Sequence, residues 1–146
     1  MSFEIRPVSY CEEAFAPILA EAEQAGGPFM LRVRDEWLSG VQRFDGPEEF
    51  LLGAWDGDLL VGVGGVSRDP YDPKPGLGRV RHIYVLRERR GQGIGRALLE
   101  ALIAGARPNF TVLRLRTRNP AAAALYEALG FLTSASDDET HRLILR

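Results

Sequence analysis

The sequence predicts a single α/β domain in which strands and helices alternate along the chain. At roughly 150 residues per domain, 146 residues leave room for one domain, residues 1–146. The composition, 45% hydrophobic and 26% charged, is typical of a folded globular chain. Apolar residues switch repeatedly between the spacing of strands and that of helices, with no internal repeat or long linker. We therefore expect one continuous core.

The composition also excludes several classes of protein. Cys11 is the only cysteine, so neither an internal disulfide nor a cysteine-based metal site can form. No apolar stretch is long enough to cross a bilayer, and the N-terminus lacks a basic segment followed by an apolar run. The net charge of −2 argues against a protein that coats nucleic acid. We expect a cytoplasmic protein without a metal, a membrane partner or a nucleic-acid partner.

The first elements are a strand over Phe3–Val8 and a helix over Tyr10–Gln24. Cys11 falls on the apolar stripe of this helix and is therefore predicted to be buried. Residues 26–28, Gly-Gly-Pro, are expected to end it.

Residues 29–46 are ambiguous, and the pattern favours a short helix over Glu36–Arg43. The next segment predicts a hairpin of Phe50–Trp55 and Leu59–Val66. Asp56-Gly57 between these apolar runs supplies the positive φ angles of a tight turn.

A Pro- and Gly-rich loop, Arg68–Gly78, precedes a predicted central strand over Arg79–Leu86. A helix then begins at Gly91 and ends near Pro108. Its apolar residues form one stripe at helical spacing: Ile94, Ala97, Leu98, Ala101 and Leu102.

Phe110–Thr117 is predicted as a strand with a solvent-facing or functional edge. Asn119 followed by Pro120 is a strong helix start, and Gly130 is a plausible residue to end that helix. The last predicted strands are Phe131–Ser134 and His141–Leu145.

Charge is divided unevenly along the chain. Residues 1–78 carry 6 basic and 14 acidic side chains, a net charge of −8, whereas residues 79–146 carry 12 and 6, a net charge of +6. The second half is suited to hold an anion. Several arginines surround one glycine cluster: Arg87, Arg89, Arg90 and Arg96. They form either an anion site or a solvated basic face.

The glycine cluster is the run RGQGIG, Arg90–Gly95, between a predicted strand and a helix. Backbone amides and the positive end of the helix converge there, which favours an anion. Alternatively, Gly93 and Gly95 only allow close helix packing. The run is not a P-loop, since Arg96 follows the last glycine, and a dinucleotide fingerprint would need a third glycine where Leu98 stands.

Two motifs resemble the GNAT superfamily of N-acetyltransferases. VLRERRGQGIGRALL, Val85–Leu99, resembles its acetyl-CoA-binding motif Gln/Arg-x-x-Gly-x-Gly/Ala, and TRNPAAAALYEALGF, Thr117–Phe131, resembles its second motif. The predicted order of elements matches the family over nearly the whole chain. The resemblance implies a mixed, mostly antiparallel sheet of about six to seven strands flanked by helices. It also implies acetyl transfer from acetyl-CoA to a primary amine by direct attack.

The resemblance further implies where acetyl-CoA binds. The strand before the glycine loop splays from its neighbour, and the backbone of Ile83, Tyr84 and Val85 pairs with the pantetheine arm. The amide of Val85 or a neighbour can stabilise the oxyanion. The remaining implied cofactor-binding residues are Arg90, Gly91, Gln92, Gly93, Ile94, Gly95, Arg96 and Asn119.

Tyr126 is the candidate catalytic acid, because a phenol can protonate the departing thiolate. It follows Asn119 by seven residues, two helical turns, so both can face the cofactor. Without the resemblance, Tyr126 would be read as a core aromatic and Asn119 as a helix cap.

No base for the incoming amine is evident. Family members often carry a base at the positions that Arg79, Arg81 and Arg114 occupy here, and arginine cannot act as a base. We expect Arg79 and Arg81 to bind a carboxylate or phosphate of the acceptor; alternatively, they pair with acidic residues of the first half. His82 is a nearby candidate for the base, but strand alternation is predicted to turn it away from Arg81, so we expect a structural histidine instead. His141 is no better supported as the base.

The sequence thus predicts an acetyl-CoA-dependent N-acetyltransferase, monomeric or homodimeric, acting on a small-molecule or peptide amine. The main alternative is a CoA-binding sensor or interaction module that has lost its base. An oxidoreductase is disfavoured by the length and by the incomplete fingerprint.

Overall fold

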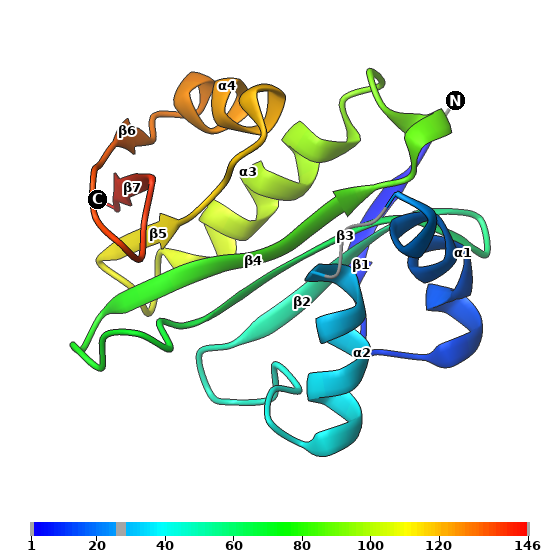
Figure 1. Ribbon diagram of the computed structural model, residues 1–146, viewed down its shortest axis with the longest axis horizontal. Coiled ribbons are helices and arrows are strands. Elements are labelled where there is room, and N and C mark those ends of the chain that lie inside the picture. Colours follow the sequence, from blue (N-terminus) through cyan, green and yellow to red (C-terminus); the bar gives the residue numbers. More distant parts are fainter. Residues whose placement is uncertain (1, 26–28, 146) are drawn as a thin grey trace.

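The computed structural model describes residues 2–25 and 29–145, which form one seven-stranded sheet in the order β1-β2-β3-β4-β5-β7-β6 (Figure 1). Only the β4–β5 pair is parallel among these strands. This confirms the mixed, mostly antiparallel sheet. The strands are β1 (Glu4–Pro7), β2 (Phe50–Asp56), β3 (Leu59–Arg68), β4 (Leu77–Val85), β5 (Val112–Leu115), β6 (Leu132–Thr133) and β7 (His141–Ile144).

Four α-helices flank the sheet: α1 (Glu12–Gln24), α2 (Phe29–Ser39), α3 (Ile94–Ala106) and α4 (Pro120–Ala128). A short 3₁₀ helix, η1 (Arg87–Arg89), follows β4. None of the helices in the described ranges is long and apolar enough to span a membrane. Residues 2–25 and 29–145 also contain no group of three or more His, Cys, Asp or Glu side chains placed to hold a metal ion.

The helices cover opposite faces of the sheet, as the alternation along β3 demonstrates. Val63 packs into the cluster formed with α1 and α2. Its neighbours Gly62 and Gly64 face α3 instead, where an added Cβ would lie 3.1 Å from Leu98 and 3.0 Å from Leu102. The two glycines therefore let α3 lie close against the sheet.

The N-terminal predictions are confirmed for the strand and helix but not for Cys11, which is exposed. The helix starts at Glu12, and Cys11 is its N-cap residue with an extended backbone, so its side chain leaves the apolar stripe. The predicted helix stop at residues 26–28 lies outside the described residues.

The predicted helix over Glu36–Arg43 is wrong in position. The observed α2 ends at Ser39, and Gly40 has a φ of +82°, outside the right-handed helical region. Its buried residues Met30 and Val33 precede the predicted segment. The apolar spacing that builds α2 therefore begins earlier than the sequence pattern indicated.

The elements after residue 50 follow the predictions closely, including the β2–β3 hairpin and the Asn119 cap. The predicted turn Asp56-Gly57 is one residue too early, because Asp56 pairs with Leu59 as the last residue of β2. The turn is therefore Gly57-Asp58, with a φ of +60° at Gly57. The predicted helix from Gly91 starts three residues later, at Ile94. Gly91 and Gly93 have φ angles of +78° and +86°, which a right-handed helix cannot contain. The residues before Ile94 thus remain a loop.

Candidate active site

The site begins where β4 and β5 separate. Their parallel pairing covers only three positions and ends at Arg79↔Arg114. Beyond it β4 continues to Val85, whereas β5 stops at Leu115 (Figure 1). This is the splay that the sequence resemblance implied. It leaves the backbone groups of the second half of β4 that point away from β3 without a neighbouring strand.

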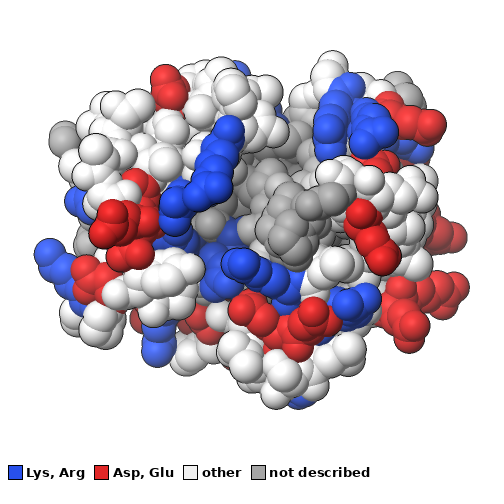
Figure 2. Space-filling model, in the orientation of Figure 1, with Lys and Arg blue, Asp and Glu red and all other residues white. Residues whose placement is uncertain are grey.

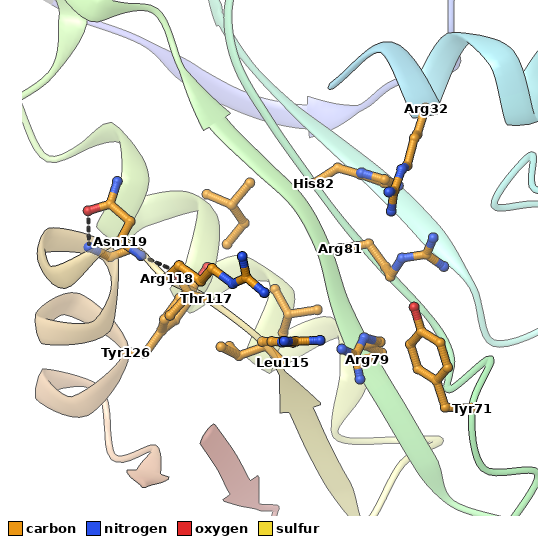
Figure 3. A pocket seen from close by; sticks show the side chains of 14 residues that line it. Arg32, Tyr71, Arg79, Arg81, His82, Leu115, Thr117, Arg118, Asn119 and Tyr126 are labelled. Atoms are coloured by element: carbon orange, nitrogen blue, oxygen red, sulfur yellow. Dashed lines mark hydrogen bonds between the residues drawn. The ribbon is translucent and has the colours of Figure 1, made fainter. Parts of the chain in front are cut away.

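A cavity of about 810 Å³ lies at this separation. Figure 3 shows Arg32, Arg81 and His82 on one side of it and Thr117, Asn119 and Tyr126 on the other. Figure 2 shows basic side chains gathered in a hollow of the same face. Among residues 2–25 and 29–145, those that line the cavity include five arginines and no Asp or Glu. The lining residues are Arg32, Tyr71, Arg79, Val80, Arg81, His82, Ile83, Leu115, Arg116, Thr117, Arg118, Asn119, Ala122 and Tyr126.

The glycine loop lies between η1 and α3. Gly91 and Gly93 have positive φ angles, and a Cβ added to either would meet nothing within 4 Å. The first amides of α3, from Ile94 onward, have no partners inside the helix and carry its positive end. The Ile94 side chain is 2% exposed and packs in the core, so only its amide can meet a ligand. The loop therefore offers an open set of donors to an anion.

The arginines around this loop are partly engaged by acidic groups. Arg89 is 2.7 Å from Asp56, and Arg96 is 3.2 Å from Glu100. Arg96 and Glu100 are both more than half exposed, so this pair is easily exchanged for another anion. The Gln92 amide, also exposed, donates to the carbonyl of Glu88 at 3.4 Å.

Arg90 folds back over the end of β4. Its Nε donates to the carbonyl oxygen of Val85 at 3.0 Å, and its guanidinium lies 5.3 Å from the centre of the Tyr84 ring. The Tyr84 hydroxyl donates to Glu21 at 2.7 Å, so this side chain points to α1 and only its backbone can contribute to the splayed edge. Burial would raise the pKa of Glu21, but the bonds from Tyr84 and the Arg87 amide lower it.

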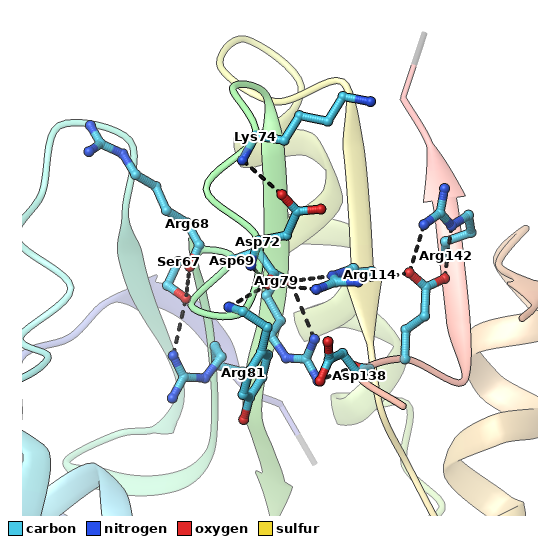
Figure 4. Close-up of polar contacts among 12 residues, drawn as sticks. Ser67, Arg68, Asp69, Asp72, Lys74, Arg79, Arg81, Arg114, Asp138 and Arg142 are labelled. Atoms are coloured by element: carbon cyan, nitrogen blue, oxygen red, sulfur yellow. Dashed lines mark hydrogen bonds and ion pairs between the residues drawn. The ribbon is translucent and has the colours of Figure 1, made fainter. Parts of the chain in front are cut away.

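Arg79 and Arg114 are buried in an ionic network (Figure 4). Arg114 donates to Asp69 at 2.8 Å and to Glu139 at 3.1 Å. Arg79 donates to Asp69 at 3.3 Å and to the carbonyl of Asp138 at 2.7 Å. The edge of Phe110–Thr117 that was predicted to be solvent-facing or functional is therefore so only in part: two carboxylates from distant loops bury Arg114, whereas Arg116 is exposed and lines the cavity.

The network lowers the pKa of both of its carboxylates. Hydrogen bonds from Arg142 lower the pKa of Glu139 to about 2, against the effect of its burial. Burial would raise the pKa of Asp69, but hydrogen bonds from Arg114 and from the Tyr71 amide lower it. Both carboxylates are therefore charged at neutral pH and unavailable as bases.

Arg81 remains at the cavity. Its side chain is 16% exposed, and it donates to Ser67 at 3.2 Å and to Glu36 at 3.4 Å. Arg79 and Arg81 thus pair with carboxylates of the first half of the chain, Asp69 and Glu36, as the alternative interpretation predicted. Both also line the cavity, and their binding of an acceptor anion stays a prediction.

His82 does not follow the predicted alternation. Tyr84 pairs with Val63 and Arg81 with Gly65, so two residues of β4 oppose the single residue Gly64. This β-bulge gives His82 a φ of +58°. The prediction that His82 faces away from Arg81 is wrong, since both side chains reach Oε1 of Glu36, at 3.9 Å and 3.4 Å.

Asn119 and Tyr126 lie on α4. The Asn119 Oδ1 accepts from the amides of Ala121 (2.9 Å) and Ala122 (3.4 Å) and so caps the helix. Tyr126 is 8% exposed, and its ring centre is 5.6 Å from that of Phe131. Burial raises the pKa of Tyr126 to about 12. The phenol therefore stays protonated at neutral pH while lining the cavity.

A profile of the acetyltransferase (GNAT) family matches residues 12–131, most of the chain. This chain belongs to the GNAT acetyltransferase family. The sequence resemblance is thereby confirmed.

Individual relatives agree with this assignment. N-alpha-acetyltransferase RimI of Mycobacterium tuberculosis is 42% identical over 85 residues, which cover 58% of this chain and 53% of that protein. The chain thus matches about half the length of this relative. A crystal structure from Exiguobacterium sp. 255-15, provisionally assigned as an acetyltransferase, has a TM-score of 0.87 at 27% identity, covering 99% of this chain and 94% of that one.

A third relative was solved with a ligand. It is the PaiA N-acetyltransferase from Thermoplasma acidophilum in complex with coenzyme A, with a TM-score of 0.70 at 19% identity and 99% coverage of both chains. At 19% identity, the similarity of the two structures is evidence for a shared fold alone.

The lining residues of this GNAT protein that were not expected from its sequence include three arginines and a tyrosine: Arg32, Arg116, Arg118 and Tyr71. Arg116 and Arg118 directly precede the Asn119 cap, and this run of basic residues is a signal that could have identified them. Arg32 lies in the ambiguous segment and Tyr71 in a loop. Only the packing of α2 and of that loop beside β4 brings these two to the cavity.

Proposed function

We propose that this protein is an acetyl-CoA-dependent N-acetyltransferase whose acceptor carries an anionic group close to its primary amine. The observation that carries the proposal is the cavity beside the splayed end of β4, where the described lining residues include five arginines and no Asp or Glu. Such a lining attracts anions and disfavours cations. Transfer takes place by direct attack of the amine on the bound thioester.

Acetyl-CoA is placed by the open edge of β4 and by the glycine loop. The pantetheine arm pairs with the backbone of Ile83, Tyr84 and Val85, and the pyrophosphate lies on the amides of the loop. The side chains of Arg90 and Arg96 are exposed enough to turn towards its phosphates. Coenzyme A in the Thermoplasma relative supports this assignment.

Tyr126 protonates the sulfur as the C–S bond breaks. Its raised pKa keeps it a proton donor at every pH at which the amine reacts. Its place on α4, seven residues after Asn119, puts both residues at the cavity. A backbone amide near Val85 stabilises the oxyanion that forms on the carbonyl.

The arginines that line the cavity have two roles: one is held in place by a carboxylate of this protein, and others can bind the acceptor. Arg79 is held by Asp69, whereas none of the ion pairs among the described residues includes Arg32, Arg116 or Arg118. These three exposed side chains are available to an acceptor carboxylate or phosphate. They also lower the pKa of a nearby ammonium by repulsion, which favours the reactive neutral amine. The name of the mycobacterial relative supports an α-amine, on a peptide or a small molecule.

The test is CoA release with acceptors matched in size and different in charge: acidic amino acids and peptides, their carboxamide counterparts, and a polyamine. We expect the acidic member of each pair to have the lower KM. Arg32→Gln should raise that KM by roughly tenfold or more, as for loss of a charged hydrogen bond. Arg34→Gln, on the same helix but paired with Asp35 and away from the cavity, should leave it unchanged. A polyamine as the best acceptor would contradict the proposal.

A second candidate is a CoA-binding sensor or interaction module with little activity. The lack of a carboxylate among the described residues at the cavity favours it, since a carboxylate is a common base for an incoming amine. Slow acetyl-CoA hydrolysis at one rate with every acceptor would support this candidate.

A further inference from the structure

We infer that His141 is the positioning residue that holds the phenol of Tyr126 at the cavity. The inference rests on the proposed function, because it takes Tyr126 as the acid that protonates the departing sulfur. His141 is buried, with 5% of its surface exposed, and does not line the cavity. It therefore influences the reaction only through the residues that it contacts.

Strand β7 gives His141 a fixed backbone. The residue pairs with Leu115 of β5 on one side and with Thr133 of β6 on the other. A strand residue that is paired on both sides has little freedom to shift. Leu115 itself lines the cavity. The imidazole thus projects from a rigid backbone one strand away from the site.

Both ring nitrogens of His141 are hydrogen-bonded. Nε2 lies 2.9 Å from Oε2 of Glu127, and Nδ1 lies 2.9 Å from the hydroxyl oxygen of Thr140. An ionised carboxylate only accepts, so Nε2 donates to it, and in the neutral ring Nδ1 accepts from the hydroxyl. That hydroxyl oxygen in turn accepts from the amide of Thr117 at 3.1 Å. Partners on both nitrogens hold the imidazole in one orientation.

This chain of bonds restrains both ends of α4. Glu127 lies in the last turn of the helix, directly after Tyr126. Thr117 precedes the first turn, and its hydroxyl accepts from the amide of the cap residue Asn119 at 3.1 Å. The start of β7 therefore fixes where the helix begins and where it ends. Because α4 has only nine residues, restraining both ends restrains the side chains between them.

The Tyr126 ring also packs directly against the imidazole. Its centre lies 6.2 Å from that of His141 and 5.6 Å from that of Phe131, both within the range of favourable aromatic pairs. Within residues 2–25 and 29–145, the Tyr126 hydroxyl has no hydrogen-bond partner. The place of the phenol is therefore set by the packing of its ring and by the position of α4. His141 contributes to both.

Catalysis is sensitive to this placement. A proton donor must come within about 2.6–3.2 Å of the atom that it protonates. A displacement of about 1 Å can lower a rate roughly a hundredfold. Phe131 offers the ring an apolar contact only, whereas the hydrogen bonds of His141 are directional. Loss of these bonds should therefore lower kcat without weakening the binding of either substrate.

Glu127→Ala is the first test, because the Glu127 side chain is 49% exposed and its removal should leave the fold intact. We expect kcat to fall about tenfold, with the acceptor KM and the Tm shift caused by acetyl-CoA unchanged. Glu127→Gln should recover most of the loss, since its amide oxygen still accepts from Nε2. Glu23→Ala, an exposed glutamate near the end of α1, is the matched control and should keep the wild-type kcat.

His141→Leu removes both hydrogen bonds with an apolar side chain that suits a buried strand position. We expect kcat to fall roughly ten- to a hundredfold. A double-mutant cycle with Tyr126→Phe separates positioning of the acid from a general structural role. Tyr126→Phe has no acid left to misplace, so adding His141→Leu should lower kcat less than about twofold further. If His141→Leu does not fold, Glu127→Ala takes its place in the cycle.

Three results overturn the inference, and they are distinguishable. If Tyr126→Phe lowers kcat but the second variant lowers it by the same factor with and without the phenol, His141 does not act through Tyr126. Wild-type kcat in folded His141→Leu and Glu127→Ala variants leads to the same conclusion, and in both cases the proposed function stands. An unchanged kcat in Tyr126→Phe, or a wild type that acetylates no amine, contradicts the proposed function and the inference with it.

Discussion

Arg79 and Arg114 stand side by side at the last paired position of β4 and β5, and both donate to the carboxylate of Asp69. Asp69 belongs to the loop between β3 and β4, and its Oδ1 also accepts from the amides of Tyr71 and Asp72. One buried carboxylate thus fixes both strands at the point where they begin to separate. It also fixes the loop that carries Tyr71 to the cavity.

Asp69→Asn should therefore destabilise the protein strongly. The Asp69 side chain is fully buried, and losing one partner of a buried ion pair costs about 3–5 kcal/mol. We expect Tm to fall by roughly 10 °C or more in a thermal melt. Asp58→Asn, at the exposed tip of the β2–β3 hairpin, is the control and should change Tm little. Equal melting of the two variants would show that the network contributes no stability.

Stability should fall in acid because of Glu139. Its pKa in the folded protein is about 2, below the ordinary 4.5, so its contribution is complete above pH 4.5 and is lost as the pH falls towards 2. Glu139→Gln should flatten the dependence of Tm on pH in this window. Glu100→Gln, at an exposed i,i+4 pair with Arg96, should leave the slope unchanged. A wild-type slope in the Glu139 variant would contradict the assignment.

Gly93→Leu should abolish stabilisation by acetyl-CoA. A side chain there meets no protein atom at its Cβ but fills the space in front of the loop amides. Gly57→Leu is a matched control, because Gly57 also has a positive φ and open space around it, at the hairpin turn. Both variants should lose about 1–2 kcal/mol from backbone strain. Only Gly93→Leu should lose the ligand-induced Tm shift, which NAD and ATP should not produce in the wild type.

Tyr126→Phe should lower kcat on the order of ten- to a thousandfold with acetyl-CoA affinity nearly unchanged. The phenyl ring keeps the packing against Phe131, and only the proton donor is lost. Tyr71→Phe is the control, since Tyr71 lines the same cavity with an exposed ring. Because the pKa of Tyr126 is about 12, wild-type kcat should show no basic limb below about pH 10 from its ionisation. An unchanged kcat in Tyr126→Phe would leave this residue a core aromatic.

The sequence by itself determined the features that depend on neighbouring residues. Gly57 specifies a hairpin turn, Asn119-Pro120 starts α4, and Gly130 follows its end with a φ of +101°. The glycine loop was predicted in the same way, because positive φ angles and missing Cβ atoms are local properties. The family motifs are also short, contiguous runs. Local chemistry therefore identified the family and predicted the cofactor loop.

Only the tertiary structure decided the acceptor side of the site. Whether Arg114 is solvent-facing or buried depends on Asp69 and Glu139, which come from separate loops. The direction of His82 depends on the register of β4 against Gly64, and the place of Arg32 depends on how α2 packs beside β4. These relationships join residues far apart in the chain. They arise from burial and charge pairing that no local pattern of residues contains.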